Sequence, residues 1–135
     1  MTKNKRILIV DDHPALREGL RSLLAAQQDF DIAGEAGDGL EAVDFVKENH
    51  PDLVLMDISM PRMDGMAATR EIKKKWPKTK ILAFTVHKTP EYVSATLEAG
   101  ADGYILKDAS RQELIAAIEE TLAGKKVVHS DSPNG

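Results

Sequence analysis

Short apolar runs alternate with longer stretches of helical period along the whole chain. The runs that predict β-strands span residues 7–10, 31–36, 53–57, 80–85 and 103–106. Four of them are nearly continuous in apolar or β-branched residues, as in strands that are buried on both faces. In 31–36 polar and apolar residues alternate, which predicts a weaker strand at the edge of a sheet.

The segments between these runs carry apolar residues at the spacing of a helix that covers a core. Leu16, Leu20 and Leu24 form the first such stripe, so a helix is predicted around them. The last helix is preceded by Ser110 and Glu113, the two members of a capping box. The other helices are predicted over 39–50, 65–76 and 90–99.

Strand and helix therefore alternate five times, without an internal sequence repeat. This order predicts an α/β fold in which helices cover both faces of a five-stranded parallel sheet. Right-handed crossovers restrict the topology to doubly wound forms. We expect a single domain over 1–124. The segment 125–135 ends in Ser, Asp, Pro, Asn and Gly, which is typical of a linker, leading to a further domain or ending a free-standing one.

Composition narrows the possible functions. The 135 residues include 22 acidic residues against 18 Lys and Arg, a formal net charge of −4, whereas a DNA-binding domain normally carries a basic surface. The absence of cysteine excludes disulfides and thiolate metal sites. No apolar stretch approaches the ~20 residues of a membrane span, and the basic N-terminus lacks the apolar core of a signal peptide. We expect a soluble cytoplasmic protein that does not contact membranes.

Polar side chains stand where the predicted strands end. Asp11 and Asp12 follow the first strand, Asp57 ends the third, Thr85 ends the fourth, and Lys107 follows the fifth. In an open α/β sheet, ligands bind outside the carboxyl ends of the strands. Each residue taken alone has an ordinary structural interpretation, such as a helix cap or a surface lysine. Because all five polar residues are predicted to lie at one edge of the sheet, a functional site is the better interpretation of the set.

The chemistry of these groups points to phosphoryl transfer. Neighbouring carboxylates repel each other unless a cation intervenes, and Mg²⁺ is typically held by one or two carboxylates together with a phosphate. An aspartate can attack phosphorus and become an acyl phosphate. An ammonium and a hydroxyl suit the phosphoryl oxygens. The hypothesis is a Mg²⁺-dependent phosphoaspartate site, with His13 beside it as a loop residue rather than a phosphohistidine.

At this point the sequence resembles a response regulator receiver domain of two-component signal transduction. The residues that carry the resemblance are ILIVDDHPALREGL, LVLMDISMPRMDGMAATREI, ILAFTVH and GADGYILKDAS, in this order and over nearly the whole chain. The resemblance implies a flavodoxin-like (βα)5 fold with strand order 2-1-3-4-5. DDHP, REGL and GYILKDAS are similar to the NarL/FixJ subgroup, whose members usually carry a LuxR-type helix-turn-helix domain.

The resemblance also implies residue roles. Asp57 would be the phospho-acceptor, while Asp11, Asp12, Asp57 and the backbone carbonyl of Ser59 would hold Mg²⁺. Thr85 and Lys107 would contact the phosphoryl group. Tyr104 would be the aromatic switch residue, which turns inward as Thr85 moves toward the phosphate, and Ser59 and His87 would tune dephosphorylation.

The expected partner is a sensor histidine kinase, with a homodimer on phosphorylation. DNA would be bound only through an output domain outside this chain, so the expected output is control of transcription. The protein would act as a switch that phosphorylates and dephosphorylates itself rather than as a metabolic enzyme. A free-standing receiver, or one in a phosphorelay, is an alternative.

Other functions are less favoured. An aspartyl-nucleophile phosphatase needs a second aspartate two residues after the first, and position 59 is Ser. A pseudo-receiver, which is an interaction module that never turns over phosphate, is disfavoured because all five groups at the strand ends are present. A flavodoxin-like FMN-binding protein is disfavoured because the acidic residues would repel the phosphate of FMN.

Overall fold

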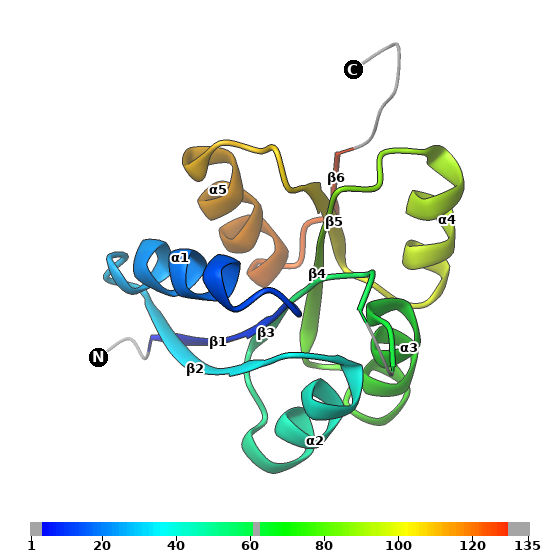
Figure 1. The fold of residues 1–135 in the computed structure, drawn as a ribbon, viewed down its shortest axis with the longest axis horizontal. Helices are drawn as coiled ribbons and strands as arrows, with labels where there is room; N and C mark the ends of the chain where they lie inside the picture. The colour runs from blue at the N-terminus through cyan, green and yellow to red at the C-terminus, as the bar shows by residue number, and fades with distance from the viewer. Residues whose placement is uncertain (1–3, 61–62, 130–135) are drawn as a thin grey trace.

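The computed structural model describes residues 4–60 and 63–129, and its elements alternate as the sequence predicts (Figure 1). The strands are β1 (Lys5–Val10), β2 (Phe30–Ala36), β3 (Leu53–Met56), β4 (Lys80–Thr85), β5 (Gly103–Leu106) and β6 (Val127–Val128). The helices are α1 (Pro14–Ala25), α2 (Gly39–Asn49), α3 (Gly65–Lys75), α4 (Pro90–Glu98) and α5 (Arg111–Leu122).

The strands form one parallel sheet in the order β2-β1-β3-β4-β5-β6. The order of the first five confirms the flavodoxin-like, doubly wound prediction, with β2 at one edge. The prediction of a five-stranded sheet is wrong in one respect, because a short sixth strand, β6, is added beside β5. Val128 pairs with Tyr104, and Val127 is buried, within a segment that the sequence analysis assigned to a linker. A strand of two residues is too short to stand out in a sequence, but it satisfies backbone groups on the outer edge of β5. The rest of that segment, 130–135, lies outside the described residues.

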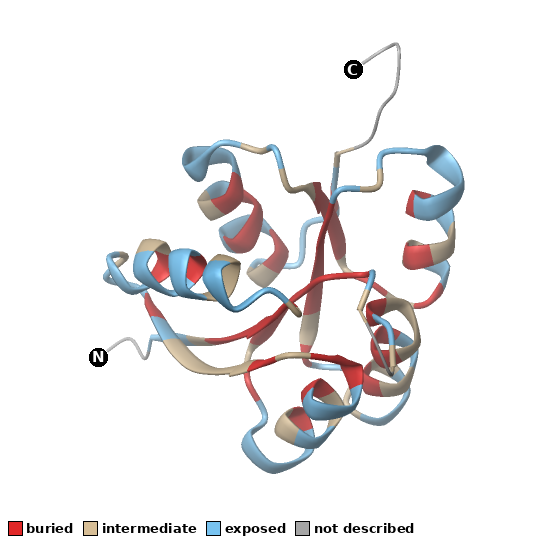
Figure 2. Cartoon of the chain, viewed as in Figure 1, coloured by how far each residue is buried: buried red, intermediate tan, exposed pale blue. Residues whose placement is uncertain are grey.

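Successive residues of each strand pack against different helices, so the sheet has a core on both faces. Alternate residues of β1, such as Ile7 and Ile9, pack with α1 and α5 in one cluster. Leu8 and Val10 face the other way and pack with α2 and α3, while Val93 of α4 packs on the same side further along the sheet. Figure 2 shows the buried residues concentrated in the strands and in the inner sides of the helices. This two-faced burial is what the continuous apolar runs predict.

Helix ends follow the local chemistry of the sequence. The Ser110–Glu113 capping box is present in full at α5, as predicted. Asp38 and Asp64 cap α2 and α3 by accepting hydrogen bonds from backbone N–H groups in the first turn. Gly100 follows α4 with a φ of 114°, a backbone conformation that favours glycine. Several predicted boundaries differ from the observed ones by a residue or two, and at the site β3 ends at Met56 and leaves Asp57 just outside the strand.

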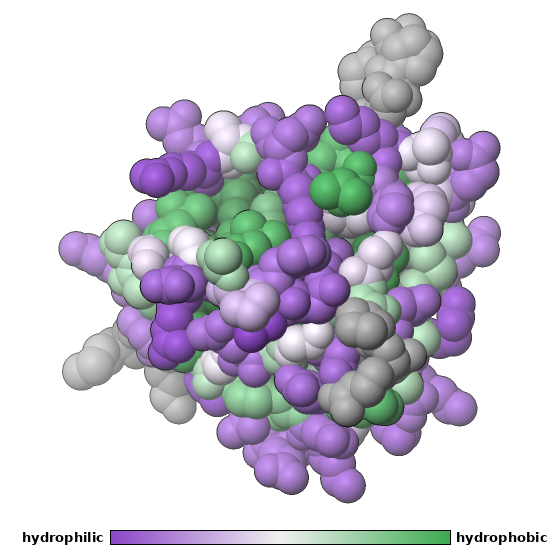
Figure 3. All heavy atoms as spheres, viewed as in Figure 1, coloured by the Kyte–Doolittle hydropathy of each residue, from purple (hydrophilic) through white to green (hydrophobic). Residues whose placement is uncertain are grey.

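Polar and charged side chains cover much of the face shown in Figure 3, and apolar atoms gather between α1 and α5. Leu23 and Ile115 line a hollow there and pack partly against the core. Among the described residues, no helix is long and apolar enough to cross a membrane.

Gly65 allows α3 to begin against the backbone that follows β3. A Cβ at this position would overlap the Asp57 carbonyl oxygen and lie 2.8 Å from Ile58 Cα. We expect Gly65→Ala to lower the free energy of unfolding by about 2–4 kcal/mol, because backbone rather than a movable side chain would have to shift. Urea unfolding followed by circular dichroism measures this change.

Gly19 provides the matched control, because it lies exposed within α1 and a Cβ there would meet nothing within 4 Å. Gly19→Ala should raise stability by about 0.5–1 kcal/mol through helix propensity. Equal effects of the two substitutions would contradict the assigned role of Gly65.

Candidate functional site

The parallel register brings the predicted polar residues to one end of the sheet. Val10 pairs with Met56, and Thr85 pairs with Leu106, so the residues that follow β1, β3 and β5 emerge at the same edge as Thr85. The Asp57 N–H continues the sheet by donating to the Val10 carbonyl at 2.9 Å. The prediction that these side chains converge is confirmed.

Three aspartates and a histidine form a compact group of potential metal ligands. One ligand atom from each of Asp11, Asp12, His13 and Asp57 lies within 4.8 Å of the others. Asp11 and Asp57 are almost fully buried. The group fits a hard divalent cation, because Asp12 Oδ1 is buried and accepts no hydrogen bond from any described residue. Asp11, Asp12 and Asp57 are therefore available to hold Mg²⁺.

His13, predicted to be a loop residue beside the site, contacts two of the aspartates directly. Its Nδ1 lies 3.0 Å from Asp11 Oδ1 and 3.1 Å from Asp12 Oδ1, although only the first contact has hydrogen-bond geometry. The His13 backbone N–H also donates to Asp11 Oδ1 at 2.8 Å. The side chain is largely exposed, so it can leave the carboxylates when a cation binds.

Lys107 lies between two of the carboxylates. Its Nζ donates to Asp11 Oδ2 at 2.7 Å and lies 3.5 Å from Asp57 Oδ2. The lysine side chain is mostly buried, so this ammonium is poorly screened by water. It neutralises negative charge that burial would otherwise make costly.

The two buried aspartates differ in pKa. Burial raises the pKa of Asp57 from 3.8 to about 6, and the charges of Asp11 and Asp12 add to the increase while Lys107 opposes it. Burial also acts on Asp11, but hydrogen bonds from Lys107 and His13 outweigh it and leave the pKa of Asp11 lowered. The pKa of Asp11 is thus lowered and that of Asp57 raised, so Asp57 is the more basic carboxylate of the pair.

The remaining predicted residues meet around the loop that follows β4. The Thr85 hydroxyl accepts from the His87 N–H at 3.2 Å, and the Tyr104 hydroxyl donates to the His87 carbonyl at 2.7 Å. Tyr104 is fully buried and points inward, and this burial raises its pKa to about 12. Ser59 donates its N–H to Asp57 Oδ1 at 3.3 Å, and its Oγ shares a hydrogen bond of 2.6 Å with His87 Nε2.

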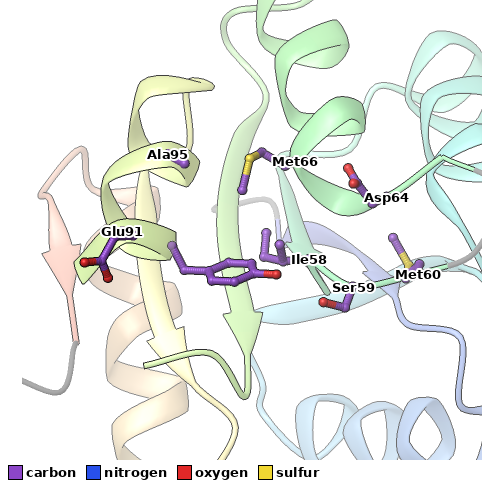
Figure 4. A pocket seen from close by; sticks show the side chains of 8 residues that line it. Ile58, Ser59, Met60, Asp64, Met66, Glu91 and Ala95 are labelled. Carbon is purple, nitrogen blue, oxygen red and sulfur yellow. The ribbon is translucent and has the colours of Figure 1, made fainter. Parts of the chain in front are cut away.

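A cavity of about 510 Å³ lies beside this network, between the loop after β3 and helix α4. In Figure 4, Ser59 and Met60 lie on the loop side of the cavity, and Glu91 and Ala95 lie on α4. Tyr92 also lines it and stacks on His87, with ring centroids 3.9 Å apart and planes within 5°. Tyr92 could not be identified from the sequence, because the position of an aromatic residue in an amphipathic helix does not reveal which residue it contacts.

Comparison with known proteins identifies the family to which the chain is similar. Residues 7–119 match the family model of the response regulator receiver domain. This region contains every residue to which the sequence analysis assigned a role.

Curated relatives match over most of this chain. The transcriptional regulatory protein YxjL of Bacillus subtilis is 43% identical over 128 residues, which are 94% of this chain and 59% of the relative. The nitrate/nitrite response regulator protein NarL of Escherichia coli is 36% identical, over 90% of this chain and 56% of its own length. The chain thus spans little more than half the length of these relatives.

A solved structure is similar in fold as well as in sequence. The two-component response regulator of the LuxR family from Aurantimonas sp. SI85-9A1 superposes with a TM-score of 0.89 at 39% identity. The match covers 98% of this chain and 92% of that structure. The comparisons confirm the resemblance noted in the sequence.

The raised pKa of Asp57 predicts a pH-dependent penalty in folding stability. Because the folded pKa lies above the unfolded value, the protonated carboxyl favours folding at low pH, and this contribution is lost as pH rises through about 6. In EDTA, Asp57→Asn should therefore unfold with a free energy higher by about 2–3 kcal/mol near pH 7.5, with the difference disappearing by about pH 4. Urea titrations of both proteins at the two pH values measure it.

Asp44→Asn is the control, since Asp44 is an exposed aspartate on α2. It should change stability by less than about 0.5 kcal/mol at either pH. A wild-type protein as stable as Asp57→Asn near neutral pH would show that Asp57 is not under electrostatic strain.

Proposed function

The chain belongs to the response regulator receiver domain family, and on this premise we propose that Asp57 accepts a phosphoryl group from a sensor histidine kinase. One observation supports this role above the others. Asp57 is a buried carboxylate just after strand β3, with the Lys107 ammonium 3.5 Å away and with Asp11, Asp12 and His13 grouped beside it. It combines a raised pKa with the nearby ammonium of Lys107, which can pair with the oxygens of an acquired phosphoryl group.

The reaction is a nucleophilic displacement at phosphorus. An Asp57 carboxylate oxygen attacks the phosphohistidine of the kinase, the P–N bond breaks, and the imidazole leaves with the bonding electron pair. The product is an acyl phosphate on Asp57. Its hydrolysis by water returns the carboxylate and releases inorganic phosphate. We propose that this chain is a switch rather than an enzyme with a separate substrate.

Mg²⁺ is the cofactor that the donor set favours. Asp11, Asp12, Asp57 and the backbone carbonyl of Ser59 would hold it, and the ion would neutralise charge on the phosphoryl oxygens. Asp12 Oδ1 supports this assignment, because it is buried and accepts no hydrogen bond within the described residues, and the exposed His13 side chain beside it can leave when a cation binds.

Lys107 and Thr85 would bind the phosphoryl oxygens once they are present. Lys107 already lies between Asp11 and Asp57, so a phosphoryl group on Asp57 offers its ammonium a new anionic partner nearby. The Thr85 hydroxyl accepts from His87 N–H and can donate its own proton to a phosphoryl oxygen. When Thr85 moves toward the phosphoryl group, it would displace the His87 backbone, and the displacement would reach the switch residue Tyr104, whose hydroxyl donates to the His87 carbonyl. Ser59 and His87 would set the lifetime of the phosphate.

The output lies beyond this receiver. We propose that residues 1–124 form the phospho-acceptor domain and that the chain after it leads to a LuxR-type DNA-binding domain. The relatives YxjL and NarL support this, since the match covers little more than half of their own length. Phosphorylation would change the receiver surface, favour a homodimer and so control transcription through the DNA-binding domain.

Phosphorylation by acetyl phosphate tests the assignment of Asp57. Incubated with acetyl phosphate and Mg²⁺, the wild-type protein should gain one phosphoryl group by intact mass spectrometry, and hydroxylamine should remove it. Asp57→Asn should gain none, because the nucleophilic carboxylate is gone, while Asp44→Asn should behave as wild type. An adduct that persists in Asp57→Asn would disprove the assignment.

Thermal unfolding tests the metal site. At a Mg²⁺ concentration tenfold above the dissociation constant, the wild-type protein should gain about 1.4 kcal/mol of stability. Asp12→Asn should lose most of this gain, because it removes an anionic ligand, and Asp44→Asn should keep it. Equal Mg²⁺ stabilisation of all three proteins would place the ion elsewhere.

A further inference from the structure

His87 is held at its backbone and at its ring by different parts of the molecule. Its N–H donates to the Thr85 hydroxyl at 3.2 Å, and its carbonyl accepts from the Tyr104 hydroxyl at 2.7 Å. Its imidazole bonds Ser59 Oγ at 2.6 Å through Nε2 and stacks against the Tyr92 ring. The backbone contacts set where the side chain begins, and the ring contacts set where it points.

The stack decides the plane of the imidazole. The two rings are nearly parallel, at 5°, and a parallel contact at 3.9 Å leaves no room for the imidazole to rotate toward α4. With the backbone of His87 held and the ring plane fixed, Nε2 is aimed at Ser59 Oγ. Without the Tyr92 ring, a single hydrogen bond would have to hold an otherwise rotatable side chain.

Tyr92 is itself held loosely on its other side. It is 37% exposed and lines the cavity of about 510 Å³ between α4 and the loop after β3. Its backbone is firmly placed in α4, where its carbonyl accepts from the Thr96 hydroxyl at 2.7 Å. Helix α4 therefore sets where the Tyr92 ring begins, and the ring lies between His87 and the cavity.

The hydrogen bond between Ser59 and His87 bridges the two loops next to the phospho-acceptor. Ser59 lies two residues after Asp57, and His87 lies two residues after Thr85. Ser59 also donates its N–H to Asp57 Oδ1, so the bridge starts from the residue that contacts the nucleophile. Because this side-chain bridge joins the two loops that flank Asp57, it would narrow the approach of water to a phosphate on Asp57.

We propose that Tyr92 is a positioning residue that holds His87 against Ser59 and thereby slows hydrolysis of the Asp57 phosphate. This inference rests on the proposed phosphorylation of Asp57. In the hydrolysis, a water oxygen bonds to phosphorus, the bond from phosphorus to the Asp57 carboxylate oxygen breaks, and the water proton passes to solvent. Tyr92 touches none of these atoms. It acts through the imidazole, and it links the phosphate's lifetime to the position of α4.

The test is the decay of phosphorylated protein after acetyl phosphate is removed. Tyr92→Leu should shorten the lifetime of the phosphate about two- to tenfold, since an aromatic pair of this kind is lost. Tyr92→Phe keeps the ring and should preserve the wild-type lifetime. Glu91→Gln is the matched control, because Glu91 is the neighbouring residue of α4 and lines the same cavity.

A double-mutant cycle separates positioning from a general effect on the fold. In a His87→Ala background, Tyr92→Leu should have no further effect on the lifetime, because the residue it positions is gone. The His87 ring protons should show an upfield ring-current shift in NMR spectra of the wild type and Tyr92→Phe, and lose it in Tyr92→Leu. Ser59→Ala removes the same bridge without altering α4 and should reproduce the faster decay.

The possible results distinguish this inference from the proposed function. If the wild-type protein forms no adduct, the phospho-acceptor role of Asp57 fails. If adducts form but Tyr92→Leu leaves the lifetime unchanged or lengthens it, only the role of Tyr92 fails. A Tyr92→Leu effect of the same size in the His87→Ala background would also overturn it.

Discussion

The ion pair of Lys107 with Asp11 is the interaction on which the site depends. Asp11 and Asp57 are both buried at the end of the sheet, where two carboxylates would repel each other strongly. Lys107 donates to Asp11 at 2.7 Å and lies 3.5 Å from Asp57, so its ammonium stabilises the Asp11 carboxylate more than the Asp57 carboxylate. The parallel register of the sheet makes this pairing possible, since β1, β3 and β5 each deliver one of the three groups to the same edge.

The unequal pairing gives the two carboxylates different tasks. Asp11 holds the shorter bond to Lys107 and a lowered pKa, so it stays anionic and suits a cation. Asp57 has a raised pKa, about 6, and the weaker hold on the lysine, which suits a nucleophile. A phosphoryl group on Asp57 would add negative charge where compensation is incomplete. The same shortage of positive charge explains the affinity expected for Mg²⁺, because Asp12 brings a further anion and an unpartnered oxygen.

The parts of the structure that the sequence predicts are those set by local pattern and by strand order. Apolar runs placed the five main strands to within a residue or two, and the strand ends identified Asp11, Asp57 and Lys107 because parallel strands finish at one edge. Strand β6 escaped prediction, since a pair of valines has no period. The contacts of His13 with two aspartates and the stacking of Tyr92 on His87 also escaped it, because they depend on side-chain rotamers and on how a helix packs beside a loop.

Two tyrosines from different elements act on opposite parts of His87. Tyr104 of β5 holds its carbonyl, and Tyr92 of α4 holds its ring. A change at Thr85 moves the His87 backbone, because the Thr85 hydroxyl accepts from its N–H, and such a movement strains both tyrosine contacts at once. If Asp57 is phosphorylated as proposed, helix α4 would receive the state of Asp57 through the stacking of Tyr92 on His87. By thermodynamic reciprocity, a partner that shifts α4 must alter the balance at Asp57 by the same free energy with which phosphorylation alters the partner's binding.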